Sequence, residues 1–131
     1  MSAGVESSRL AGQWRRKAEH DWAMARQGMK IKKDCPYDMV CFHAQQCAEK
    51  YLKALLVSLG IDFPKTHDLL EIAGFLPAGI RPGASTNELA VLTSYAVEPR
   101  YPTEGGEVTK KEALQALCIA DGIRQTILRR R

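Results

Sequence analysis

The sequence lacks a hydrophobic run long enough to cross a membrane, and it lacks the alternating apolar and polar pattern of a β-strand. A transmembrane helix needs about 20 apolar residues, and a half-buried strand has its apolar side chains at every second position. No basic segment followed by an apolar one opens the chain, so no signal peptide is predicted. The 131 residues therefore predict one all-α domain, spanning residues 1–131, which we expect in the cytoplasm and not in a membrane.

The sequence also lacks the motifs of several enzyme classes. It has no G-x-S-x-G, no P-loop and no G-x-G-x-x-G. Its four cysteines (Cys35, Cys41, Cys47 and Cys118) form no C-x-x-C pair. On a helix Cys41 and Cys47 point in different directions, whereas the ligands of a zinc ion must converge. We therefore expect no metal and no cofactor, and we interpret the cysteines as small buried thiols in a reducing compartment.

Positive charge is present in excess, with a formal net charge of +4. The basic residues gather in three groups: Arg15 to Lys17, Lys30 to Lys33, and Arg129 to Arg131. Such groups neutralise phosphates in nucleic-acid-binding proteins. They also occur at solvated helix ends, where cations complement the helix dipole. The second interpretation is favoured, because no aromatic residues that would stack on bases interleave with the charges.

Capping residues and helix breakers divide the chain into segments. A first helix is predicted from a cap at Ser7 or Ser8 to about Lys33, because apolar residues recur at three- and four-residue spacings. These residues are Leu10, Trp14, Ala18, Trp22, Ala25 and Met29. A second helix is predicted to start at residues 34–36, where Asp caps and Pro fits a first turn, and to end at Gly60.

Three further helices are predicted downstream. Thr66 is expected to cap a short helix over residues 67–76. Capping boxes that begin at Ser85 and Thr109 open the last two helices, the first ending near Val97 and the second reaching the terminal arginines. The chain therefore predicts an antiparallel four-helix up-and-down bundle with one short extra helix.

Polar residues gather on one side of the predicted second helix when successive residues are placed about 100° apart. They are His43, Gln45, Gln46, Glu49, Lys50 and Lys53, and Phe42 and Leu56 lie among them. The opposite side is apolar and is predicted to be buried, with Val40, Ala44, Cys47, Tyr51 and Leu55. The polar side is either a solvated face with an i,i+4 ion pair or a partly buried face that meets a protein or a ligand.

The polar residues form the pattern F-H-x-Q-Q-x-x-E-K-x-x-K from Phe42 to Lys53, and a T-H-D-L segment from Thr66 to Leu69 follows a glycine turn. This combination resembles the signature region of prokaryotic HEPN-domain proteins. The first helix around Asp21 and the segment 95–102 are also similar to that family. The resemblance covers residues 14–127.

The resemblance implies a helical bundle that forms a homodimer and is encoded beside a minimal nucleotidyltransferase, as a two-component module of toxin–antitoxin character. It also implies nucleotide binding, and in many members a metal-independent ribonuclease activity. We expect the polar residues to line a cleft for a protein, nucleotide or RNA partner. The candidate site residues are His43, Gln45, Gln46, Glu49, Lys50, Lys53, His67, Asp68, Arg100 and Tyr101.

Two of these candidates have alternative interpretations. His67 follows a predicted cap, where amide donors favour an anion, but His67 and Asp68 also suit a helix first turn that satisfies backbone donors. Arg100 lies between prolines and its guanidinium matches phosphate oxygens, or it makes a structural ion pair.

The ribonuclease members of the family use an R-x(4–6)-H motif in the later half of the domain. Here the pattern occurs once, from Arg15 to His20, in the first predicted helix. A chance match of this kind is unsurprising in a chain with ten arginines and three histidines. The sequence therefore favours an interaction protein over an enzyme.

Overall fold

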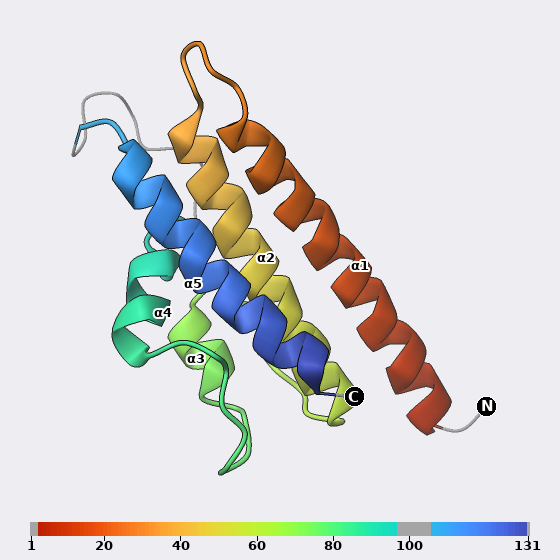
Figure 1. The fold of residues 1–131 in the computed structure, drawn as a ribbon. Helices are drawn as coiled ribbons and strands as arrows, with labels where there is room; N and C mark the ends of the chain where they lie inside the picture. Colours follow the sequence, from red (N-terminus) through yellow and green to blue (C-terminus); the bar gives the residue numbers. More distant parts are fainter. Residues whose placement is uncertain (1–2, 97–105, 131) are drawn as a thin grey trace.

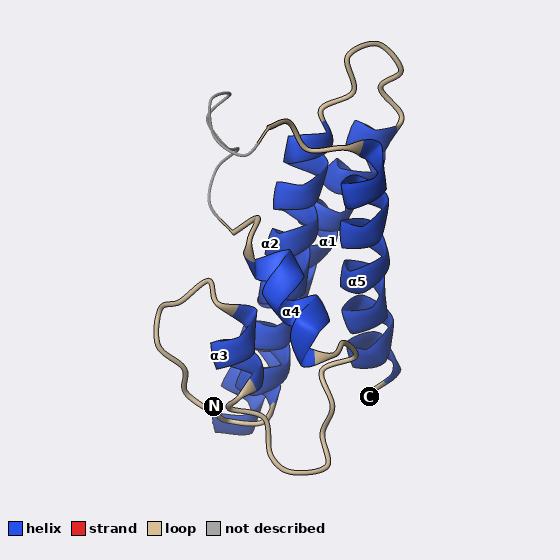
Figure 2. Cartoon of the chain, turned by 90° about the vertical axis from the view of Figure 1, so that its left-hand side faces the viewer, coloured by secondary structure: helices blue, strands red, loops and turns tan. Residues whose placement is uncertain are grey.

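Five helices make up the computed structural model, which describes residues 3–96 and 106–130 (Figures 1 and 2). They are α1 (Ala3–Met29), α2 (Tyr37–Ser58), α3 (Leu69–Ala73), α4 (Thr86–Thr93) and α5 (Lys110–Arg129). These described ranges contain no strand, so the predicted all-α fold class is confirmed.

The long helices α1, α2 and α5 lie side by side, and α2 packs against both of the others (Figure 1). α1 runs antiparallel to α2 and α5, and the short α4 packs against α5. α3 is the extra helix and packs against α2 and α4. The predicted up-and-down bundle is therefore present, although its third member, α4, has only 8 residues.

The core lies around α2. The five residues predicted to be buried on this helix (Val40, Ala44, Cys47, Tyr51 and Leu55) are each at most 5% exposed. α1 contributes small residues at seven-residue intervals, Ala11, Ala18 and Ala25, which are fully buried and let the two helices approach closely. A Cβ on Gly28 would lie 2.9 Å from Cγ2 of Val40, so the helix pair is tight at this end.

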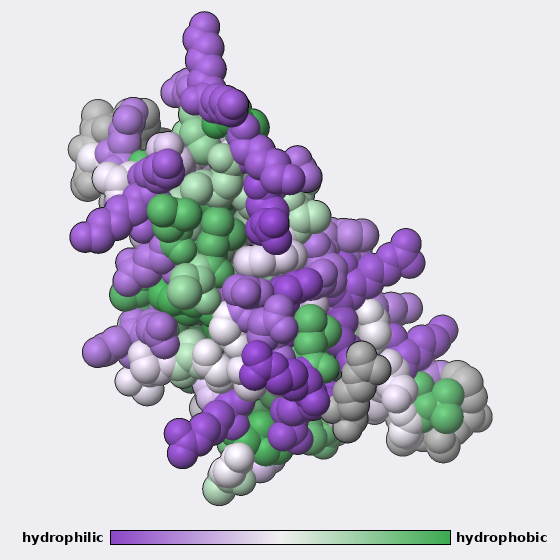
Figure 3. All heavy atoms as spheres, viewed as in Figure 1, coloured by the Kyte–Doolittle hydropathy of each residue, from purple (hydrophilic) through white to green (hydrophobic). Residues whose placement is uncertain are grey.

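One residue of the apolar pattern that predicts α1, and one of the cysteines interpreted as buried, are exposed. Leu10 is 47% exposed, because the buried face of α1 passes through Ala11 instead. Cys41 and Cys47 are buried as expected, but Cys118 is exposed on α5, where Leu114 is also half exposed. Figure 3 shows apolar side chains exposed along part of α5, on a face that is otherwise mostly hydrophilic.

The connection between α1 and α2 differs from the prediction. α1 begins before the expected serine caps and ends at Met29, four residues short of Lys33. Asp34 does not cap α2 but takes a left-handed conformation with φ of 53°, and Pro36 is the N-cap without a side-chain hydrogen bond. Residues 30–36 belong to neither helix, because they form the turn that reverses the chain between two closely packed helices.

Other ends follow the predicted local chemistry. Ser85 and Thr109 each form a complete capping box, as expected. Gly60, with φ of 72°, terminates α2: its amide donates to the Val57 carbonyl and the next amide donates to the Leu56 carbonyl. This is the Schellman pattern, in which a glycine accepts the left-handed conformation.

The short helices are shorter than predicted. α3 begins at Leu69 because Asp68, rather than Thr66, is its N-cap and accepts a hydrogen bond from the Leu70 amide. Thr66 instead accepts a hydrogen bond from the Asp68 amide. α4 ends at Thr93, because residues 94–96, which were predicted to continue it, form a turn; its predicted end, Val97, lies outside the described residues. Across the described ranges, no helix has the length and apolar character that a membrane span requires.

Candidate functional site

Asp21 of α1 joins two side chains of α2 in a group that we call the Asp21 cluster: Asp21, His43 and Lys50. Oδ1 of Asp21 lies 2.8 Å from Nδ1 of His43, and Oδ2 lies 2.5 Å from Nζ of Lys50. The Asp21 side chain is only 11% exposed, whereas those of His43 and Lys50 are 20% and 25% exposed. The carboxylate is thus buried beneath two partly exposed basic groups.

Glu49 organises a second group, the Glu49 cluster: Gln45, Gln46, Glu49, Lys53 and His67. Oε1 of Glu49 lies 2.8 Å from Nδ1 of His67 and accepts a hydrogen bond of 3.1 Å from the Gln45 amide. Oε2 accepts a hydrogen bond of 3.0 Å from Nζ of Lys53. Both oxygens of the carboxylate are therefore used inside the protein.

The two glutamines complete the Glu49 cluster. The Gln45 amide also donates to the backbone carbonyl of His67 (3.1 Å), and its oxygen accepts from the Gln46 amide (2.7 Å). Gln45 is fully buried. The two consecutive glutamines therefore have different roles. Gln45 connects the segment before α3 to α2, and Gln46 provides the hydrogen bond that the buried Gln45 oxygen requires.

Lys53 is buried in an unusual environment for an ammonium group. Its Nζ lies 5.6 Å from the ring centroid of Trp14 and 5.7 Å from that of Phe63, and these rings meet edge to face. Glu49 neutralises this ammonium, and the two aromatic rings add a cation–π attraction to it. Lys53 connects α1, α2 and the loop after α2 in this way.

A third group, the Glu19 cluster (Glu19, Tyr51 and Arg124), connects α1, α2 and α5. Arg124 donates to both oxygens of Glu19, at 2.6 and 3.0 Å, and its guanidinium lies over the ring of Trp22. Tyr51 donates its hydroxyl proton to Glu19. The Arg124 hydrogen bonds lower the pKa of Glu19, and burial together with the bond to Glu19 raises the pKa of Tyr51.

Eight of the ten predicted site residues lie in the described part of the chain: His43, Gln45, Gln46, Glu49, Lys50, Lys53, His67 and Asp68. All except Asp68, which caps α3, belong to the Asp21 or Glu49 cluster. The predicted approach of Lys53 to His67 occurs through Glu49, which binds both. Arg100 and Tyr101 lie outside the described residues.

The polar side of α2 is therefore a partly buried face. Gln45, Glu49 and Lys53 are at most 7% exposed, whereas His43, Gln46 and Lys50 reach the surface in part. Both lysines that were expected to offer positive charge to a ligand are ion-paired with carboxylates. This pairing leaves the two clusters close to electrical neutrality, which disfavours a phosphate site built on these lysines.

Arg15 and His20, the residues of the R-x4-H pattern, lie on α1. Their five-residue separation turns them about 140° apart on a helix. Arg15 lines a cavity against α2 and α5, and His20 is exposed. The pattern does not bring its two side chains together within one chain.

Four residues of these clusters were missed as site candidates: Glu19, Asp21, Tyr51 and Arg124. Asp21 carried a readable signal, because it lies three positions after the buried Ala18, on the apolar face of α1. A charge within an apolar stripe indicates a buried ion pair. The pairing of Glu19 with Arg124 could not be predicted in this way, because 105 residues separate the two in the sequence.

The described residues contain no group of three or more His, Cys, Asp or Glu side chains placed to hold a metal ion. Each histidine of the two clusters faces a single carboxylate. Such a pair orients an imidazole and fixes its tautomer, with the carboxylate at Nδ1. The clusters can therefore position a histidine or connect helices.

Known proteins resemble this chain in sequence and in fold. A family model of the HEPN domain matches residues 11–130. The crystal structure of TT1696 from Thermus thermophilus is similar, with 26% identity, a TM-score of 0.75, and coverage of 91% of this chain and 96% of that one. The structure of ST0689, an archaeal HEPN homologue, shares the fold, with 23% identity, a TM-score of 0.59, and coverage of 90% and 94%. No curated protein matches the chain.

Proposed function

Since the chain belongs to the HEPN domain family, we propose that it is a helical interaction protein that forms a homodimer and pairs with a minimal nucleotidyltransferase. The pair would be a cytoplasmic two-component module of toxin–antitoxin character. The partner class comes from the sequence resemblance described above. The geometry of α2 supports an interaction role.

The observation that carries this proposal is a mixed strip on α2, which we call the α2 strip: Met39, Phe42, His43, Gln46 and Lys50. Met39 is 37% exposed, and the other four are partly buried. Apolar anchors among polar groups are typical of protein interfaces.

The polar members of the α2 strip are held in place from below. Asp21 fixes His43 and Lys50, and Gln45 fixes Gln46. Side chains that are ordered before binding lose less conformational entropy when a partner docks. The charge of Lys50 is paired with Asp21 beneath the strip, which favours a protein over a polyanion.

The homodimer is tested by light scattering at micromolar concentration, where we expect twice the 14.6 kDa of one chain. Phe42→Glu should shift the protein toward monomers, because it places a charge within the α2 strip. Leu114→Glu is the matched control, since Leu114 is 50% exposed on α5, outside the strip. A wild-type protein that scatters only as a 14.6 kDa species would contradict the dimer.

The nucleotidyltransferase partner is tested by co-expressing the protein with the product of the neighbouring reading frame. A stable complex that Phe42→Glu weakens and Leu114→Glu preserves is the expected result. If the neighbouring gene encodes an unrelated protein that does not bind, the paired-module proposal fails.

A metal-independent ribonuclease is the second candidate, and the Asp21–His43 pair favours it. A carboxylate on Nδ1 presents Nε2 as the nitrogen that acts as a general base. RNA should then be cleaved without metal by the wild type, and the His43→Ala variant should be inactive. Equal turnover by both proteins, or none by either, removes His43 from this role.

Nucleotide binding is the remaining part of the proposal, and it depends on Arg100. A labelled nucleotide and a short RNA can be titrated against wild type and Arg100→Ala at two salt concentrations. RNA affinity should fall steeply with salt because counterions are released on binding. The paired lysines of the two clusters lead us to expect weak binding.

A further inference from the structure

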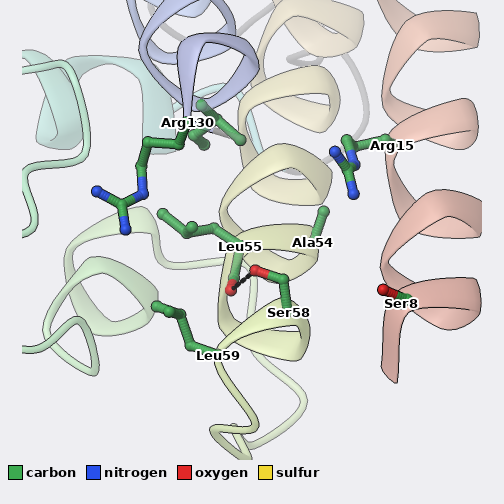
Figure 4. A pocket seen from close by; sticks show the side chains of 8 residues that line it. Ser8, Arg15, Ala54, Leu55, Ser58, Leu59 and Arg130 are labelled. Atoms are coloured by element: carbon green, nitrogen blue, oxygen red, sulfur yellow. Dashed lines mark hydrogen bonds between the residues drawn. The ribbon is translucent and has the colours of Figure 1, made fainter. Parts of the chain in front are cut away.

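A cavity of about 330 Å³ lies between α1, α2 and α5 at the end where α2 terminates (Figure 4). Its apolar lining includes Leu55, Leu59 and Ile127. Ser8 and Arg15 of α1, Ser58 of α2 and Arg130 after α5 add polar groups to it. This volume is at the small end of the range for ligand pockets, roughly 300–1,000 Å³.

The two arginines stand on opposite sides of the α2 residues in this cavity (Figure 4). Of the eight residues that line it, Arg15 and Arg130 carry positive charge and none carries negative charge. No residue of the Asp21, Glu49 or Glu19 cluster lines it either. The cavity is therefore a separate and positively charged place in the fold.

Arg15 differs from comparable cations in the described part of the chain. Four Lys or Arg residues there are less than fully exposed, namely Arg15, Lys50, Lys53 and Arg124. Lys50, Lys53 and Arg124 each have a carboxylate partner within 3.0 Å. Among the described residues Arg15 has none, although a partly buried guanidinium gains most from an anion.

The C-terminal carbonyls of α2 do not require Arg15 and Arg130 as hydrogen-bond donors. Its last carbonyls, from Leu55 to Val57, already accept hydrogen bonds from the amides of residues 59–61 and from the Ser58 hydroxyl. Cations near a helix C-terminus often satisfy such carbonyls, but these are satisfied without them. The partly buried Arg15 is therefore not used by these carbonyls, and Arg130 is exposed to solvent.

We propose that this cavity binds a small organic dianion, with one end at the partly buried Arg15, its uncharged part against Leu55, Leu59 and Ile127, and its other end toward the exposed Arg130. A phosphate monoester or a dicarboxylate has the required charge, and a guanidinium binds either through paired hydrogen bonds. Ser8 supplies a hydroxyl donor. The Ser58 hydroxyl proton is used by Leu55, so its oxygen remains as an acceptor for a ligand hydroxyl. This site is independent of the interaction role proposed for the α2 strip.

The test is isothermal titration of the full chain in a buffer free of phosphate and carboxylate, with glycerol phosphate and succinate as separate probes. One-site saturable binding of at least one probe is expected, about tenfold weaker in Arg15→Gln and in Arg130→Gln. Arg16→Gln is the matched control, because Arg16 is exposed and does not line the cavity. The probe that binds more tightly identifies the anion class.

Amide chemical shifts of the wild-type protein provide a second measurement that does not depend on a variant folding. The bound probe should shift the signals of Ser8, Arg15 and Ser58. The proposal is overturned if neither probe saturates, if Arg16→Gln weakens binding as much as Arg15→Gln, or if the shifts centre on the exposed lysines at positions 30–33.

Discussion

Arg124 of α5 makes two hydrogen bonds to Glu19 of α1, although 105 residues separate them and α2 packs against both of their helices. Tyr51 of α2 donates to the same carboxylate. One carboxylate therefore joins the three long helices at a single level of the bundle. Its charge state should influence the stability of the whole domain.

Glu19→Gln is expected to lower the free energy of unfolding by roughly 1–2 kcal/mol at pH 7, less than a fully buried pair because 41% of the Glu19 side chain is exposed. The folded-state pKa of Glu19 is lowered from 4.5, so its contribution is fully present above that value and is lost as pH falls through the folded pKa. Urea unfolding should therefore show a larger difference between the two proteins at pH 7 than at pH 3. An equal difference at both values would contradict the assignment.

Asp21→Asn is expected to destabilise the protein by roughly 1–3 kcal/mol, because it leaves His43 and Lys50 without their buried anion. The exposed Arg9–Glu6 pair on the same helix is the control. Glu6→Gln should change stability by less than about 0.5 kcal/mol. Similar unfolding midpoints for both variants would show that the Asp21 ion pairs stabilise the fold no more than a surface pair does.

Leu55→Ala should cost roughly 2–5 kcal/mol, since Leu55 is 5% exposed in the core. The lower end of that range is expected because Leu55 already borders a cavity. Leu114→Ala removes the same atoms from a side chain that is 50% exposed and should cost less than about 0.5 kcal/mol. A loss below that value at Leu55 would place this residue at the surface.

Gly83→Ala should destabilise the protein by roughly 1–3 kcal/mol, because Gly83 has φ of 91° and a Cβ there would lie 2.7 Å from the carbonyl oxygen of Gly122. Gly12→Ala is the opposite case. Gly12 lies inside α1, and apart from its chain neighbours and the nearby backbone of its own helix no atom lies within 4 Å of the added Cβ, so alanine there should stabilise the helix by roughly 0.5–1 kcal/mol. Thermal unfolding should show a lower melting temperature for Gly83→Ala and a higher one for Gly12→Ala than for the wild type.

Local chemistry was readable from the sequence wherever one short segment decided the outcome. The capping boxes at Ser85 and Thr109, the glycine end at Gly60 and the buried side of α2 were all predicted correctly. These features depend on neighbours within about four residues, which the sequence displays directly. The HEPN family was recognised in the same way, from closely spaced residues, and is confirmed.

Ion pairs between helices that are distant in the sequence could not be predicted from the sequence. The sequence indicated the i,i+4 pair of Glu49 with Lys53 on one side of α2, but not that Asp21 of α1 neutralises Lys50. Whether a polar face is solvated, paired or open to a ligand depends on which helix covers it. Periodicity within one helix contains no information on that neighbour.

Each of the two tryptophans of α1 lies beside a cation from another part of the fold. Trp14 is 5.6 Å from the Lys53 ammonium and Trp22 is 5.1 Å from the Arg124 guanidinium, by ring centroid. Because the chain has only these two tryptophans, the surroundings of Lys53 and of Arg124 each contain one intrinsic fluorophore. Emission from single-tryptophan variants therefore reports separately when α1 parts from the loop after α2 and when it parts from α5.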